Sequence, residues 1–303
     1  MLLTLPVLIV ASSCSTPNVS PEDGEKREGT GAADSGVNLV DSTTVLGAYA
    51  NPLDPITHPD ATKERIIAQA YNSTLKQCME GRGFEYIEGM GELRRSSESD
   101  AQYVYSVTDP QVAAVYGFHP QSWVEDAIKS EARLTEPSPS VAYTDALYGD
   151  MHTVKVFDQD GVEIGSYDPE SCVGVANDTV RPNWAEERQL DALAWEISLA
   201  VNEQSTPEVI EGFAAWSVCM KDSGFEYATP WDANNEFDSN LPTAPEIEVA
   251  VASAECQQST GLIKTWSRVR AELVHKELEK HPGIITRWNE IQQESLSLVE
   301  KVQ

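Results

Sequence analysis

The sequence predicts a mainly α-helical protein with one small β-hairpin, built from two unequal helical repeats that are each stapled by a disulfide. Three observations lead to this prediction. Beyond residue 60, most apolar residues are spaced three and four apart, which is the period of an amphipathic helix. One stretch instead alternates around an Asp-Gly turn, as hairpins do. The phrase Cys-Met-x-x-x-Gly-Phe-Glu-Tyr also occurs twice, at 78–86 and at 219–227.

Residues 1–13 have the pattern of a secretory signal peptide. The apolar run at 2–10 is too short to span a bilayer as a helix, and small residues follow it at 11–13. Cys14 comes next, and this order resembles the lipobox of bacterial lipoproteins, where the signal is cut before a Cys that then carries acyl chains such as palmitate. We therefore expect lipidation at Cys14. An ordinary secretory signal followed by an incidental Cys is the alternative.

Residues 14–60 are predicted to be a lipidated Cys followed by a disordered tether. The stretch is rich in Ser, Pro, Gly, Asp and Thr, and it contains too little apolar surface to order itself. As a random coil, such a tether would hold a folded module roughly 35–40 Å from the membrane.

Cysteine usage points to two disulfides. The chain has five Cys, an odd number for an exported protein, so acylation of Cys14 would leave an even set. The four others can pair in several ways, and their number alone does not choose between them. Each copy of the repeated phrase opens with Cys and is followed by one more Cys. We therefore expect Cys78–Cys172 and Cys219–Cys256, with buried free thiols as the alternative.

The first stapled repeat is expected at 61–204, with the hairpin as an insertion. A long helix should cover 61–82, followed by short helices at 123–133 and 141–148 and an amphipathic helix at 182–203. The hairpin strands should be 154–157 and 162–167, joined by Asp158-Gln159-Asp160-Gly161. This turn lacks the flanking Asp and Glu of a calcium loop.

The second stapled repeat and a C-terminal helical hairpin are expected at 205–303. Thr206 and Pro207 provide an N-cap and a first helical residue. Further helices should cover 245–258, 262–280 and 284–302, and the last two should fold back into an antiparallel pair about Pro282-Gly283.

The repeated phrase has the pattern of a helix C-terminus. Gly83 and Gly224 can adopt the left-handed conformation that ends a helix. Counting back three places from the C-cap side puts Met79 and Met220 where the following Phe should pack. The Tyr two places after each Phe should continue the same apolar cover if the chain leaves extended.

Glu85 and Glu226 are the remaining identical positions of the phrase, and on an extended exit they should face solvent. The functional alternative pairs them across a cleft as a general acid and base or as cation ligands. Asp232, Asn234, Glu236 and Asp238 form the best calcium candidate, although an acidic solvent-facing loop fits them better. Trp231, expected in that loop, could stack on a sugar or a peptide.

We expect no cofactor, no catalytic set and no metal site. The five His form no spaced metal pair, and no Ser lies in a Gly-x-Ser-x-Gly elbow. The formal net charge of -28 argues against binding to nucleic acid or to anionic lipid by the folded part.

Together the Cys-Met-x-x-x-Gly-Phe element, the Cys behind a signal, and the stretches 116–118 and 142–149 resemble uncharacterised actinobacterial cell-surface lipoproteins. The resemblance implies a membrane attachment through lipid outside the cytoplasm. We expect a non-enzymatic binding or scaffolding role, with a cell-envelope protein or glycan as partner. The alternatives are a carboxylate-dependent envelope hydrolase and a small-molecule or calcium-binding module. The oligomeric state stays open.

Overall fold

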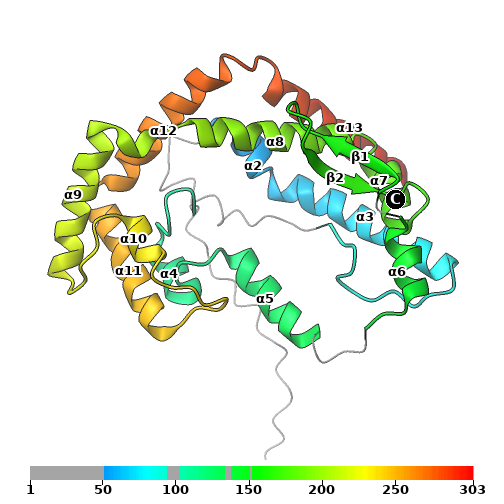
Figure 1. Ribbon diagram of the computed structural model, residues 1–303, viewed down its shortest axis with the longest axis horizontal. Coiled ribbons are helices and arrows are strands. Elements are labelled where there is room, and N and C mark those ends of the chain that lie inside the picture. The colour runs from blue at the N-terminus through cyan, green and yellow to red at the C-terminus, as the bar shows by residue number, and fades with distance from the viewer. Residues whose placement is uncertain (1–50, 94–102, 134–137, 151, 303) are drawn as a thin grey trace, which may run out of the picture. The chain divides into compact units, whose positions relative to one another are not determined.

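The computed structural model describes residues 51–93, 103–133, 138–150 and 152–302 (Figure 1). The expected signal peptide, Cys14 and all of the expected tether up to residue 50 lie outside this part of the chain. The described residues are mainly helical and include one two-stranded antiparallel sheet, so the predicted fold class is confirmed.

In chain order, the first half contains α2 (Asp54–Thr57), α3 (Ala61–Gly81), α4 (Pro110–Tyr116), α5 (Gln121–Arg133), α6 (Val141–Tyr148), β1 (Val154–Phe157), β2 (Glu163–Tyr167), α7 (Cys172–Val180) and α8 (Trp184–Ala200). The second half contains η3 (Glu203–Ser205), α9 (Pro207–Asp222), α10 (Pro230–Asn234), α11 (Ala244–Ser259), α12 (Leu262–Leu278) and α13 (Ile284–Val302).

All expected helices form near their expected bounds, and four short ones were not predicted: α2, α4, α7 and α10. Their apolar stripes are too short to show a period, but caps mark the starts of three of them. Asp109 caps α4 and Ser171 caps α7 through side-chain oxygens that accept backbone N–H groups. The folded part also begins before residue 60, because Leu53 and Ile56 beside α2 are buried.

The hairpin forms as expected. β1 pairs with β2 antiparallel, Val154 lies opposite Tyr167, and the register shifts by a bulge next to Phe157. The Asp158 carboxylate accepts the N–H groups of Asp160 at 3.0 Å and Val162 at 2.7 Å. Asp158 therefore closes the turn, as the turn interpretation requires.

Both disulfides have the sequential pairing. The Cα atoms of Cys78 and Cys172 are 5.5 Å apart, and those of Cys219 and Cys256 are 5.7 Å apart. Each bond ties the last turns of a long helix, α3 or α9, to a second helix, α7 or α11. The alternative of free thiols is excluded for these four residues.

Each copy of the repeated phrase ends its helix in a Schellman motif. Gly83 has φ 86° and Gly224 has φ 94°. The N–H of Phe84 donates to the carbonyl of Met79 at 3.0 Å, and the N–H of Gly83 donates to that of Glu80 at 2.9 Å. The second copy makes the same two bonds, from Phe225 to Met220 and from Gly224 to Lys221. The predicted helix cap is confirmed in both copies.

Tyr86 and Tyr227 of the phrase are partly buried beside these caps, and the hydroxyl group of each donates a hydrogen bond to a carboxylate. The Tyr86 hydroxyl donates to Glu92 Oε1 at 3.1 Å, and the Tyr227 hydroxyl donates to Glu236 Oε2 at 2.6 Å. Burial and the hydrogen bond to Glu236 raise the pKa of Tyr227 to about 12. The partner lies at a different distance along the chain in each copy, so the sequence pattern alone does not show this equivalence.

The buried apolar residues form three clusters. The first core is built mainly by α3, α6 and α7, and the second core by α9, α11 and α12. A central cluster joins α2, α8 and parts of α12 and α13. One disulfide lies in each of the first two cores.

The chain nevertheless crosses between the cores. Residues 103–119, expected in the first repeat, pack in the second core through Tyr105, Val107 and Phe118. Gln257 of α11 holds this 103–119 segment by donating to the carbonyls of Tyr105 at 3.2 Å and Val107 at 2.9 Å. The expected boundary at 204/205 thus does not separate two independent packing units.

Glu246 of α11 fixes the far end of the 103–119 segment. Its side chain is 0% exposed, and its carboxylate accepts the N–H groups of Phe118 at 2.9 Å and Thr243 at 3.2 Å. His119 Nε2 lies 3.2 Å from Glu246 Oε1, an ion-pair distance without hydrogen-bond alignment. Gly117 has φ 59°, and a Cβ there would approach Glu246 Oε1 to 2.4 Å.

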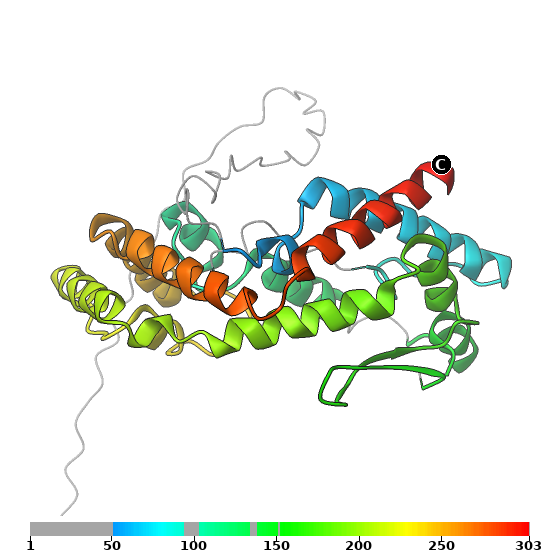
Figure 2. The same cartoon turned by 90° about the horizontal axis from the view of Figure 1, so that it is seen from above.

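The predicted antiparallel pair of C-terminal helices is wrong. α12 packs on α9 and α11, whereas α13 packs on α3 and α7 and places Val299 in the first core. In both views α12 and α13 diverge from the bend at 282–283 (Figures 1 and 2). A helix with an apolar stripe packs wherever a core is incomplete, and the first core lacks one wall without α13.

The positive φ of Gly83 predicts that Ala substitutions at Gly83 and at Gly81 change the stability of the protein differently. Gly83→Ala should lower the free energy of unfolding by roughly 1–2 kcal/mol, because an L-residue is strained at positive φ. Gly81→Ala, two residues earlier at the end of α3 with open space around it, should be neutral or stabilising by about 0.5–1 kcal/mol. Urea unfolding without reductant measures both, and equal losses would contradict the cap.

Candidate functional site

The structure does not bring Glu85 and Glu226 together. Both side chains are exposed, as expected, and they follow the ends of α3 and α9, which belong to different cores. The two helix ends lie apart in both views (Figures 1 and 2). Glu226 has an exposed Lys221 Nζ at 3.9 Å. The pair is therefore no candidate for acid–base work.

Two acidic residues of the calcium candidate, Asp232 and Glu236, accept local hydrogen bonds. Asp232 forms a capping box with Thr229 at the start of α10, and Glu236 accepts the hydroxyl of Tyr227. Among the described residues, no three His, Cys, Asp or Glu gather in a way that could hold a metal. Trp231 lies inside α10 and is half-buried against the second core, so the prediction of an open loop there is wrong.

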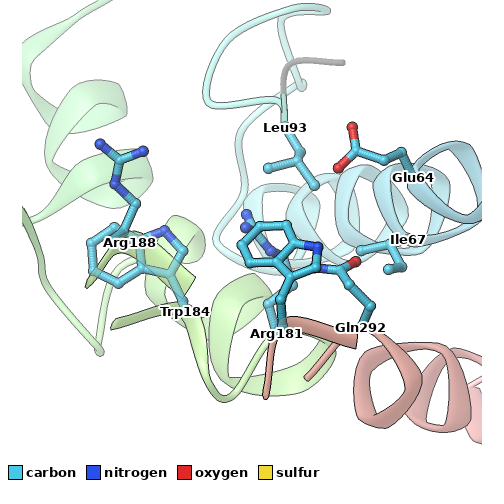
Figure 3. A pocket seen from close by; sticks show the side chains of 8 residues that line it. Glu64, Ile67, Leu93, Arg181, Trp184, Arg188 and Gln292 are labelled. Atoms are coloured by element: carbon cyan, nitrogen blue, oxygen red, sulfur yellow. The ribbon is translucent and has the colours of Figure 1, made fainter. Parts of the chain in front are cut away.

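A cavity of about 430 Å³ lies between α3, α8 and α13. Its wall combines two indoles, two guanidinium groups, one carboxylate, one amide and two aliphatic side chains: Trp184, Trp288, Arg181, Arg188, Glu64, Gln292, Ile67 and Leu93. Figure 3 shows Glu64 and Ile67 on the side of α3, facing Trp184 and Arg188 from α8 across the cavity. We call it the indole cavity.

Trp184 is held in one orientation. The Tyr167 ring of β2 meets it edge to face, with ring centroids 5.0 Å apart and planes at 64°. Gly165 of the same strand leaves room for the indole, since a Cβ there would be 3.1 Å from Trp184 Cη2. The hairpin therefore has a role in the site, because it braces this aromatic wall.

Each guanidinium group of the cavity already has an anionic partner. Arg181 Nε donates to Glu187 Oε2 at 2.9 Å, and its Nη2 donates to the same oxygen. Arg188 Nη1 donates to Asp191 Oδ2 at 3.1 Å, and its Nη2 donates to the Ile164 carbonyl at 3.3 Å. These bonds fix both planar groups at the wall.

Within the described part of the chain, Glu64 is the one carboxylate that lines the cavity. Burial raises the pKa of Glu64, and the nearby Glu187 adds to the rise, whereas Arg181 opposes it. Burial also raises the pKa of Asp191 behind the wall, against the attraction of Arg188 and Arg181. Among the described residues, no side chain or backbone group donates a hydrogen bond to Glu64, so its oxygens are available to a ligand.

The arrangement can hold a ligand that has an apolar face and several polar groups. Aromatic walls with a few placed polar groups are typical of small-molecule sites. Sequence reasoning missed this site, because its residues come from several distant segments. Trp184 and Glu64 each lie on an amphipathic helix, where a single Trp or Glu does not indicate a cavity. Trp195, also on α8, is by contrast 63% exposed.

No protein-family model, curated protein or solved structure matches this chain. The two disulfides indicate an oxidising, extracytoplasmic environment. Within the described residues, no helix has the length and apolarity needed to cross a membrane.

The raised pKa of Glu64 predicts a pH-dependent stability difference. A carboxyl group whose pKa is raised by folding keeps its proton longer in the folded state, so its ionisation destabilises the protein as the pH rises above the ordinary Glu pKa. Glu64→Gln should therefore melt at a higher temperature than the wild type at neutral pH. The two should converge below the ordinary Glu pKa.

Thermal melts across the acidic and neutral range measure this difference. Glu85→Gln removes an exposed charge and provides the matched control, with little expected change. A Glu64→Gln protein that melts below the wild type at neutral pH would show that the Arg181 attraction outweighs the burial of the carboxylate.

Proposed function

We propose that this chain is a lipid-anchored, extracytoplasmic binding protein and that the indole cavity is its ligand site. The single observation that carries the proposal is the cavity wall, where two indoles, two hydrogen-bonded guanidinium groups and one carboxylate line the same cavity. Its volume of about 430 Å³ lies within the range of about 300–1,000 Å³ common for ligand sites.

The anchor part of the proposal rests on the sequence. An apolar run, small residues and then Cys14 have the lipobox order, and the following residues have a tether composition. The disulfides agree with export. A module held at the membrane by a tether reaches components of the cell envelope, which are the ligands and partners we propose for it.

The cavity supports binding better than hydrolysis. A glycoside hydrolase needs two carboxyl groups that flank one bond, about 5–10 Å apart. Among the residues that the structure describes, Glu64 is the single carboxylate of the wall, and no Ser, Thr, Cys or His side chain lines it as a nucleophile or base. Asp191 is engaged by Arg188 behind the wall.

The anchor is tested with the full-length chain produced in a bacterium that processes lipoproteins. Fed with an alkyne fatty acid, the wild-type protein should take up the label and partition with membranes, because acyl chains on Cys14 bury many methylene groups. Cys14→Ser should do neither. The double variant Cys219→Ser, Cys256→Ser is a control that removes one disulfide but should keep the label.

The ligand site is tested by thermal melting with a soluble digest of bacterial cell wall. A ligand of the folded state must raise the melting temperature, so the digest should stabilise the wild type and leave Trp184→Ala unchanged. Trp195→Ala is the matched control, since it removes an exposed indole from the same helix. A digest that stabilises all three proteins equally, or none, would refute the indole cavity as the site.

A further inference from the structure

We propose that the ligand of the indole cavity is a neutral saccharide, bound with a ring face against Trp184. This inference deepens the proposed function and rests on it. It follows from the charge balance of the wall, from the fixed position of the indole and from the mixture of donors and acceptors around it.

The charged groups of the cavity are nearly balanced. The two lining guanidinium groups, Arg181 and Arg188, are paired with Glu187 and Asp191, which do not line the cavity, and the lining carboxylate of Glu64 adds one formal negative charge. The whole chain carries a formal net charge of -28. The cavity therefore offers no positive potential that would attract an anion.

An anionic ligand would also have to displace existing partners. Arg181 gives two N–H groups to Glu187, and Arg188 is divided between Asp191 and the Ile164 carbonyl. A phosphate or carboxylate could not be held bidentately by either group without leaving a carboxylate unpaired. An added anion beside Glu64 would further oppose the ionisation of that group, which burial already disfavours.

A cationic ligand is disfavoured for a different reason. Glu187 and Asp191 are already paired with Arg181 and Arg188, so an ammonium group inside the cavity would gain one unpaired carboxylate and would also lie beside both guanidinium groups. Glu64 alone faces it from α3. The electrostatics therefore favour a ligand without net charge.

A sugar ring matches the remaining chemistry. Its C–H face is apolar and flat enough to cover an indole, while its hydroxyl groups both donate and accept. Glu64 can accept hydrogen bonds, Gln292 can both donate and accept, and Arg181 Nη1 has no hydrogen bond to a described residue. Tyr167 and Gly165 hold Trp184 in place before binding, so little entropy is lost.

The test titrates purified wild-type protein with defined probes and follows Trp fluorescence and heat. The neutral probes are tri-N-acetylglucosamine, maltotriose and mannotriose. The charged probes are trigalacturonate and spermidine, and an alanyl-glutamyl wall peptide tests a non-saccharide ligand. We expect saturable binding of at least one neutral trisaccharide and no comparable binding of the other probes.

Three variants tie the binding to the cavity. Trp184→Ala should weaken the neutral saccharide by about tenfold or more, as expected for loss of an aromatic contact and its buried area. Trp184→Phe, which keeps a ring and guards against a folding defect, should retain part of the affinity. Trp195→Ala should bind like the wild type.

Each contrary outcome has a defined meaning. If none of the neutral saccharides binds, or if binding is unaffected by Trp184→Ala, the inference is wrong. If trigalacturonate, spermidine or the peptide binds instead and Trp184→Ala abolishes that binding, the saccharide inference fails while the indole cavity remains a ligand site. If the cell-wall digest also fails to stabilise the wild type, the proposed function fails with it.

Discussion

The structure depends on one constraint: neither half of the chain closes its own hydrophobic core. The second core needs the 103–119 segment, which ends 88 residues before α9 begins (207 − 119), and the first core needs the C-terminal helix α13. Glu246 attaches the 103–119 segment to the second core. Its side chain is fully buried, so its carboxylate needs hydrogen-bond donors, and the Phe118 N–H is one of them. A buried carboxylate without such donors would be strongly destabilising. The two halves are therefore joined through their interiors.

The repeated phrase has the same structural role at 78–86 and at 219–227. In both copies the same residues make a Schellman cap, join the helix end to a second helix by a disulfide and place a partly buried Phe against the core that contains the Met. These interactions are local, and for that reason the two copies agree closely. Their surroundings differ, because the end of α3 packs on the first core and the end of α9 packs on the second. The repeated phrase therefore forms two equivalent helix ends, each capped and disulfide-bonded, and its two copies do not form a common site.

The indole cavity forms because α13 packs against α3 and α8. Glu64 comes from α3 and Trp184 from α8, but the wall is completed by Gln292 of α13. Had α13 folded back on α12, as an ordinary helical hairpin would, that wall would be missing. The hairpin insertion contributes by bracing Trp184 through Tyr167. The candidate function therefore lies where separate segments meet, in a region that no single motif marks.

Sequence alone determined the helices, the hairpin, both disulfides and the cap of each repeated phrase, because periodicity, turn residues and capping are set by neighbours along the chain. Short helices such as α7 were missed because two turns are too few to show a period. Tertiary structure alone decided where the apolar stripe of α13 packs, and which carboxylates meet Arg181 and Arg188. An apolar stripe specifies that a helix must be buried but not against which partner. A charged residue likewise gives no sign in the sequence of whether it will be solvated or enclosed, and so the cavity could be recognised only once the chain had folded.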